Sequence, residues 1–208
     1  MAKLAVLIPS YNELNNIKKI VKYKYNFLVV DDYSSDGTNI FLKEKKIKFL
    51  RNKKNLGYEK SLIKGMKTLM HKKYQTICTI DADAEHPFKK INTLYKYFKK
   101  NNFDILVCNR KSQNRFLEKI LSLFFFKKFK LKDPMSGMKF YKTTALKKTI
   151  NYSSSEYFLV DLIYIGIQKK LKIGNFEIKT KKNLYNSKIG NNFNIQLKII
   201  KIFKFLFY

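Results

Sequence analysis

Short apolar runs alternate with longer polar stretches along the first half of the chain. Within the polar stretches, apolar residues recur every three or four positions, as at Leu62, Met66 and Leu69, which is the spacing of one helix face. Continuous apolar strands that alternate with helices are typical of a parallel sheet covered on both faces. The sequence therefore predicts an α/β fold. The predicted strands are residues 4–8, 26–30, 47–50, 76–80 and 103–108.

The second half has a different pattern, in which aromatic residues and lysines share the same segments. Residues 114–130 and 194–207 are predicted to be amphipathic helices, with aromatic faces that are edged by lysines. Residues 156–169 predict a further helix, and residues 171–179 predict a strand. No internal repeat or flexible linker interrupts the chain, so we expect a single domain over residues 1–208.

The chain of 208 residues carries 44 basic and 15 acidic side chains, for a formal net charge of +29. Nearly all of the basic residues are lysines, Asn, Ile, Phe and Tyr are abundant, and Trp is absent, a pattern typical of a coding bias toward A and T. We therefore expect a solvated lysine surface and no nucleic-acid binding. The alternative is attraction to an anionic partner, which is a lipid surface, a phosphate or nucleic acid.

Cys78 and Cys108 are the only cysteines, and both lie inside apolar runs without CxxC spacing. They are expected to be buried, reduced thiols of a cytoplasmic protein. No apolar stretch approaches the ~20 residues that a membrane-spanning helix needs. No signal peptide is visible in the sequence.

Carboxylates follow two of the predicted strands. Asp81, Asp83 and Glu85 come directly after the fourth strand, and Asp31 and Asp32 end the second. The carboxyl ends of parallel strands form the ligand-binding edge of such a sheet. Gathered carboxylates repel one another unless a cation neutralises them, and a hard divalent cation (Mg²⁺ or Mn²⁺) binds through one or two carboxylates plus substrate phosphates. The alternative is that these acids cap a helix or form a solvated turn.

Five motifs occur in an order that resembles a known family. They are VLIPSYNE (6–13), VVDDYSSDGT (29–38), NLGY (55–58), DADAEHP (81–87) and DPMSGMKFY (133–141). Together they resemble the family 2 inverting glycosyltransferases, and within that group the dolichol- or polyprenyl-phosphate mannose or glucose synthases. The resemblance covers roughly residues 3–190. It implies the GT-A fold, a Rossmann-like and mostly parallel sheet with helices on both faces and amphipathic helices at the acceptor side.

The resemblance implies three functional segments within the single domain. Residues 1–110 would be the nucleotide-sugar-binding half, residues 111–190 the acceptor half and residues 191–208 an amphipathic C-terminal tail.

The resemblance also implies a nucleoside pocket at the first two motifs. Pro9, Tyr11 and Glu13 would line this pocket. Asp32, rather than its neighbour Asp31, would hydrogen-bond the base or the ribose of the donor.

The diphosphate of the donor is expected to lie beside the acidic motif. Asp81 and Asp83 would hold Mg²⁺ or Mn²⁺ and bind the nucleotide sugar, with Glu85 near the metal or the sugar. Ser187 and Lys188 match a C-terminal Ser-Lys pair that closes over the diphosphate, with Ser187 bordering the acceptor. His86 is interpreted as a turn residue and not as a metal ligand.

The resemblance places cations and small residues on the acceptor side. Arg110 would contact phosphate and, with Asp83, serve catalysis. Arg115 could meet the acceptor phosphate, while Ser136 and Gly137 would shape the acceptor side. If the acceptor is a sugar hydroxyl, a carboxylate must act as general base, and Asp133 is the best candidate for that role. A lipid phosphate is already ionised and needs cations, not a base.

The expected reaction is inverting transfer of a hexose, mannose or glucose, from a nucleotide diphosphate sugar to a polyprenyl or dolichyl phosphate at the inner face of the cytoplasmic membrane. GDP-mannose, UDP-glucose and UDP-N-acetylglucosamine all stay open as donors. The amphipathic segments 114–130 and 194–207 fit peripheral contact with an anionic membrane. Alternatively, both segments could close the core, or the tail could pair with another subunit. The alternative acceptor is a cell-surface polysaccharide or lipopolysaccharide glycan. A non-catalytic, basic module that binds membrane or nucleic acid is the alternative of another class.

Overall fold

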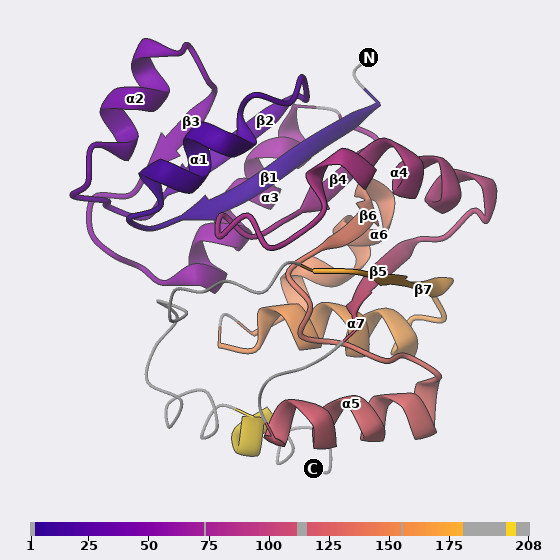
Figure 1. Ribbon diagram of the computed structural model, residues 1–208. Helices are drawn as coiled ribbons and strands as arrows, with labels where there is room; N and C mark the ends of the chain where they lie inside the picture. Colours follow the sequence, from indigo (N-terminus) through magenta and orange to yellow (C-terminus); the bar gives the residue numbers. More distant parts are fainter. Residues whose placement is uncertain (1–2, 73, 112–115, 155, 181–198, 203–208) are drawn as a thin grey trace.

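The structure is a computed structural model that describes residues 3–72, 74–111, 116–154, 156–180 and 199–202. Its centre is one sheet of seven strands (Figure 1). The strands are β1 (Leu4–Ser10), β2 (Phe27–Asp31), β3 (Phe49–Arg51), β4 (Thr76–Thr79), β5 (Ile105–Arg110), β6 (Lys139–Lys142) and β7 (Ile173–Ile178).

Helices connect these strands and flank the sheet. The α-helices are α1 (Leu14–Ile20), α2 (Thr38–Glu44), α3 (Tyr58–His71), α4 (Ile91–Lys100), α5 (Phe116–Phe129), α6 (Thr143–Thr149) and α7 (Phe158–Gln168). Two 3₁₀ turns, η1 (Phe88–Lys90) and η2 (Ile150–Tyr152), extend the start of α4 and the end of α6.

The strand order is β3-β2-β1-β4-β6-β5-β7, and all pairings are parallel except those of β6, which runs antiparallel to both β4 and β5. The carboxyl ends of β1, β2, β4 and β5 therefore lie at one edge of the sheet. Because β6 is reversed, its first residue lies at that same edge: Lys139 is opposite Thr79 of β4 and Val107 of β5. The chain order reverses between β1 and β4, which is where such sheets bind their ligands.

Two apolar clusters pack against opposite faces of the sheet, because successive strand residues point to opposite sides. Helices α3, α6 and α7 cover one face, where residues such as Leu62 and Leu162 are buried. Helix α5 lies beyond α7 and contacts it through the rings of Phe129 and Tyr164 (Figure 1). Helices α1, α2 and α4 cover the other face, where Ile17, Leu42 and Phe98 are buried. The expectation of a mostly parallel sheet with helices on both faces is confirmed.

Most predicted elements lie within a few residues of the observed ones, but α6 and the reversal of β6 were not predicted. Cys78 and Cys108 are free and buried, as expected. Burial raises the pKa of both thiols, that of Cys108 to about 12. Among the helices that the structure describes, none has the length and apolar character needed to cross a membrane.

Candidate functional site

Loops from the ends of β1 and β2 are tied together by side-chain hydrogen bonds. Asn12 donates its backbone N–H to Ser34 Oγ across 2.9 Å. Leu14 donates its N–H to Asp36 Oδ2, also at 2.9 Å, while Asp36 Oδ1 accepts from the N–H and hydroxyl of Thr38. Asn12 holds a left-handed backbone conformation, with φ of 54°. These bonds hold the loop after β1 against the loop after β2, at the carboxyl edge of the sheet.

Asp32 organises the loop that follows β3. Its Oδ1 accepts hydrogen bonds from Asn52 Nδ2 at 2.7 Å and Leu56 N at 2.8 Å, and its Oδ2 accepts one from Gly57 N at 2.8 Å. Gly57 has φ of 90° and ψ of 164°, a conformation that favours glycine. Asp32 is thus engaged by three protein donors, and any contact with a base or ribose comes in addition to them.

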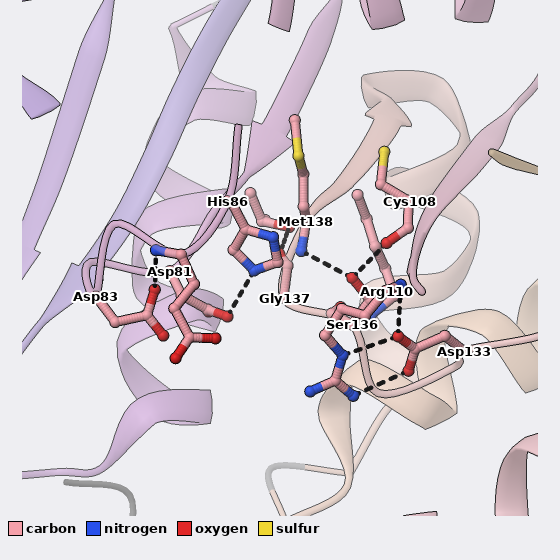
Figure 2. Close-up of polar contacts among 12 residues, drawn as sticks. Asp81, Asp83, His86, Cys108, Arg110, Asp133, Ser136, Gly137 and Met138 are labelled. Atoms are coloured by element: carbon pink, nitrogen blue, oxygen red, sulfur yellow. Dashed lines mark hydrogen bonds and ion pairs between the residues drawn. The ribbon is translucent and has the colours of Figure 1, made fainter. Parts of the chain in front are cut away.

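Asp81 is held by two side chains from other parts of the chain, and Figure 2 shows one of them, His86. Tyr58 donates its hydroxyl hydrogen to Asp81 Oδ1 at 2.6 Å, and His86 Nε2 lies 3.0 Å from Oδ2. A Cβ at Gly137 would overlap this carboxylate, so glycine is required for the close approach. Burial raises the pKa of Asp81, but the hydrogen bonds from His86 and Tyr58 and the charge of Arg110 outweigh it, so the pKa is lowered.

Asp83 has the opposite electrostatic environment. Burial and the negative charge of Asp81 raise its pKa to about 7. Its Oδ1 accepts a hydrogen bond of 3.0 Å from the N–H of Glu85. The turn between them requires a left-handed Ala84, with φ of 62°. Two neighbouring carboxylates that cannot both ionise freely form a site that favours an added cation.

The chemistry of this pair fits a hard divalent cation. The structure gathers no group of three or more His, Cys, Asp and Glu side chains that could hold a metal in the part of the chain that it describes. Asp81 and Asp83 therefore offer two carboxylates, and phosphate oxygens of a substrate would have to complete the shell, as Mg²⁺ and Mn²⁺ commonly require. The role of Glu85 as a third metal ligand stays a prediction.

Arg110 ends β5 and is bound on two sides by carboxylates. Its backbone N and its Nε donate to Asp133 Oδ2 at 3.0 and 2.9 Å, and its Nη2 donates to Asp133 Oδ1 at 3.0 Å (Figure 2). Glu118 of α5 lies 3.4 Å from the same Nη2. Burial lowers the pKa of Arg110, but these carboxylates and Asp81 outweigh it and raise the pKa, so the guanidinium stays charged.

The loop before β6 presents a second buried cation behind the site. Lys139 is fully buried, and its ammonium donates to the carbonyl oxygen of Ser136. Ser136 Oγ donates to the carbonyl of Cys108 at 2.6 Å, which joins this loop to the end of β5 (Figure 2). Burial lowers the pKa of Lys139 to about 8, while the charges of Asp133 and Asp81 oppose that shift.

The remaining predicted residues lie at different depths. Pro9 is buried in β1, Tyr11 is 45% exposed just after this strand, and Glu13 is the residue that precedes α1. Glu13 Oε2 accepts a hydrogen bond from Asn16 Nδ2 at 2.7 Å. The predicted residues Arg115, Ser187 and Lys188 lie outside the described residues.

Four residues of this site were given no functional role from the sequence: Tyr58, His86, Glu118 and Lys139. His86 is a turn residue, as interpreted, but its ring is buried against Asp81. The position of Lys139 at the start of an apolar strand could have marked it as a paired residue of the site, because buried lysines are rare unless they are paired. Nothing in the sequence alone placed Glu118 beside Arg110.

Comparisons with known proteins agree with this architecture. Among solved structures, glucosyl-3-phosphoglycerate synthase from Mycobacterium tuberculosis, in complex with Mn²⁺, UDP and glucosyl-3-phosphoglycerate, superposes with a TM-score of 0.73. The match covers 97% of this chain and 77% of that chain at 11% identity. It shows the fold, and the GT-A prediction is confirmed.

Archaeal proteins are among the relatives that match by sequence. An uncharacterized protein of Methanocaldococcus jannaschii is 35% identical over 133 residues, which cover 59% of this chain and 58% of that protein. The UDP-N-acetylglucosamine–dolichyl-phosphate N-acetylglucosaminyltransferase of Methanococcus voltae is 25% identical over 230 residues, covering 93% of this chain and 92% of that protein. The profile described as Glycosyl transferase family 2 matches residues 5–151. The chain therefore belongs to glycosyl transferase family 2.

Proposed function

We propose that this chain transfers a sugar, with inversion, from a nucleotide diphosphate to a polyprenyl or dolichyl phosphate at the cytoplasmic face of a membrane. The burial and hydrogen bonding of Asp133 are the observation that supports a phosphate as the acceptor. Its carboxylate is 1% exposed and accepts three hydrogen bonds from Arg110. It is therefore poorly placed to take a proton from a sugar hydroxyl, whereas a phosphate acceptor needs no base.

The donor would bind across the carboxyl edge of β1, β2 and β4. Asp81 and Asp83 would hold Mg²⁺ or Mn²⁺, which when bound would neutralise charge on the leaving diphosphate. Tyr58 and His86 orient Asp81 for that task, and Gly137 lets its carboxylate lie close to the β6 loop. The complex of the mycobacterial fold neighbour with Mn²⁺ and UDP supports this assignment.

Positively charged groups would position both the diphosphate of the donor and the phosphate of the acceptor. Arg110 lies close enough to Asp81 for their charges to interact, so it can stabilise charge on either side of the reacting centre. The dolichyl-phosphate acceptor named for the Methanococcus voltae relative supports a lipid phosphate, and its UDP-N-acetylglucosamine donor adds an N-acetylhexosamine to the hexoses expected from sequence.

The test is transfer by the purified protein with Mn²⁺ or Mg²⁺ and a panel of donors: UDP-N-acetylglucosamine, UDP-glucose and GDP-mannose. Nucleotide diphosphate release is measured with and without detergent-solubilised dolichyl or undecaprenyl phosphate. We expect release from one donor that depends on the lipid phosphate, and no release by the Asp83→Asn variant. Donor binding without lipid-dependent release would contradict the phosphate acceptor and favour a glycan hydroxyl. Failure to bind any donor would favour the non-catalytic module.

A further inference from the structure

Arg110 is held by two carboxylates that contact its guanidinium with different strength. Asp133 accepts from Nε and Nη2 across 2.9 and 3.0 Å. Glu118, in the first turn of α5, accepts from the same Nη2 at 3.4 Å. A charge-assisted hydrogen bond between a guanidinium and a carboxylate is normally about 2.7–2.9 Å long. The contact with Glu118 is therefore the weaker of the two, and Asp133 is the group that anchors Arg110.

The burial of Glu118 is not explained by the helix that carries it. A carboxylate in the first turn of a helix is favoured by the helix dipole, but an exposed side chain receives that benefit as well. Glu118 is instead 3% exposed, and burial of a carboxylate costs free energy unless a charged partner compensates for it. Arg110 is such a partner, so Glu118 draws on a cation that the proposed reaction also needs.

Arg110 faces the candidate metal site as well as these two carboxylates. Its side chain is 22% exposed, and its charge interacts with that of Asp81. Figure 2 shows the guanidinium between Asp133 and the loop that carries Asp81 and Asp83. A phosphate monoester, which carries a charge of about −1.5 to −2 near pH 7, would be attracted by Arg110 and repelled by Glu118. The phosphate and Glu118 therefore compete for the same guanidinium.

We propose that Glu118 occupies Arg110 in the empty site and that the phosphate of the acceptor displaces it, which makes Glu118 a residue that determines acceptor specificity. The inference deepens the proposed function and rests on its phosphate acceptor. An anion must replace the carboxylate before it gains the contact with Arg110, so a weakly charged anion gains too little to bind. Glu118 thus admits a phosphate monoester and excludes phosphodiesters, which keep a single negative charge and include the headgroups of ordinary phospholipids.

The binding test uses the full chain without a donor, so that it can fail independently of the transfer assay. Calorimetry measures the affinity for geranyl phosphate, a monoester, and for dibutyl phosphate, a diester. The Glu118→Gln variant keeps the size of the side chain and an oxygen that can accept from Arg110, but removes the charge. We expect it to bind geranyl phosphate roughly tenfold more tightly than the wild type, and to bind dibutyl phosphate at concentrations where the wild type does not.

Two further variants control for net charge and for folding. Glu44→Gln, at an exposed acid of α2 on the opposite face of the sheet, makes the same change in net charge and should bind both phosphates like the wild type. Glu118→Met, which is also uncharged and similar in volume, should reproduce the tighter binding if Glu118→Gln does not fold. Circular dichroism establishes that each variant is folded.

Transfer kinetics separate this role from a purely structural one. We expect Glu118→Gln to lower the KM for the lipid phosphate and to leave the KM for the donor unchanged. A carboxylate that only positions Arg110 would give the opposite sign, because its loss would misplace the guanidinium and raise the KM for the lipid phosphate. Unchanged or weaker binding of geranyl phosphate by Glu118→Gln, in a protein whose wild type transfers to a lipid phosphate, would overturn this inference alone. Failure of every variant and of the wild type to bind geranyl phosphate would overturn the phosphate acceptor with it.

Discussion

The hydroxyl of Tyr58, at the start of α3, donates a hydrogen bond of 2.6 Å to Asp81 Oδ1, in the loop after β4. Burial raises the pKa of Tyr58 well above its usual value, and the negative charge of Asp81 adds to the shift, so the phenol stays protonated and remains a donor. The contact joins the NLGY and DADAEHP motifs, which are separated by more than twenty residues in sequence.

The Tyr58→Phe variant should keep the fold and bind the metal ion more weakly. Removing the hydroxyl leaves Asp81 with His86 as its remaining side-chain hydrogen-bond partner among the described residues. Loss of such an orienting contact typically costs tenfold or more in metal affinity or activity. We expect the Mn²⁺ concentration for half-maximal transfer to rise about tenfold. Manganese binding measured by electron paramagnetic resonance gives a readout that is independent of turnover. Tyr152→Phe, at an exposed tyrosine of η2, is the control. An unchanged Mn²⁺ titration would show that the contact serves packing only.

Asp83 should make the metal-free protein less stable as the pH rises toward 7. Its folded pKa is raised from 3.8 to about 7, so between these values the native state binds more protons than the unfolded state. The free energy of unfolding therefore falls with rising pH across that window, and the loss is complete above it. In EDTA, urea unfolding should show Asp83→Asn and wild type similar near pH 4 and the variant more stable near pH 8. Equal pH slopes for the two proteins would contradict this assignment.

The same shift predicts proton release on metal binding. Below pH 7 the carboxyl of Asp83 is largely protonated in the absence of a cation, and a bound Mn²⁺ or Mg²⁺ displaces the proton. Calorimetry in buffers of different ionisation enthalpy should find about one proton released near pH 6 and fewer near pH 8. Release that does not vary with pH would contradict the prediction.

Most strands of the sheet could be predicted because they are short apolar runs, such as LAVLI and FDILVC, that alternate with longer segments of helical spacing. The reversal of β6 was not predictable from its own residues. KFYK reads as a strand in either direction, and pairing with β4 and β5 decides which way it runs. Helix α6 follows β6 directly, without a linker that would mark its start.

The candidate site likewise has some residues that the sequence points to and others that only the folded structure reveals. Asp81 and Asp83 could be proposed as a cation site from the sequence because carboxylates gathered at a strand end cost free energy unless they serve a cation. Tyr58, Glu118 and Lys139 act across long sequence separations, and only the folded chain brings them to Asp81, Arg110 and Ser136. Asp133 was singled out from its place in the loop before β6, but its binding to Arg110 depends on side-chain geometry that no sequence spacing encodes.

Gly137→Ala should disable the site. The added Cβ would overlap the carboxylate of Asp81, which is itself fixed by Tyr58 and His86 and has little room to yield. Displacement of a catalytic group by about 1 Å can cost roughly 10²-fold in rate, so we expect a loss of this order in kcat/KM for the donor. The control is Gly166→Ala in α7, where the nearest atoms are 3.2 Å away at the flexible ends of isoleucine side chains. Comparable activity in the two variants would mean that Asp81 can move without consequence.

Asp133→Asn distinguishes a structural carboxylate from a general base. The substitution leaves Arg110 partly buried without its main counter-charge, and breaking a buried ion pair costs about 3 kcal/mol of stability or more. We expect the free energy of unfolding to fall by about that amount and transfer to weaken, because Arg110 loses its position. The acid limb of the pH–rate profile should stay where it is in the wild type. The control, Asp104→Asn, removes a more exposed pair with Lys142 at 3.0 Å and should cost only about 0–1 kcal/mol. A general base would give the reverse result: a stable variant whose acid limb disappears, which would move the acceptor from a phosphate to a hydroxyl.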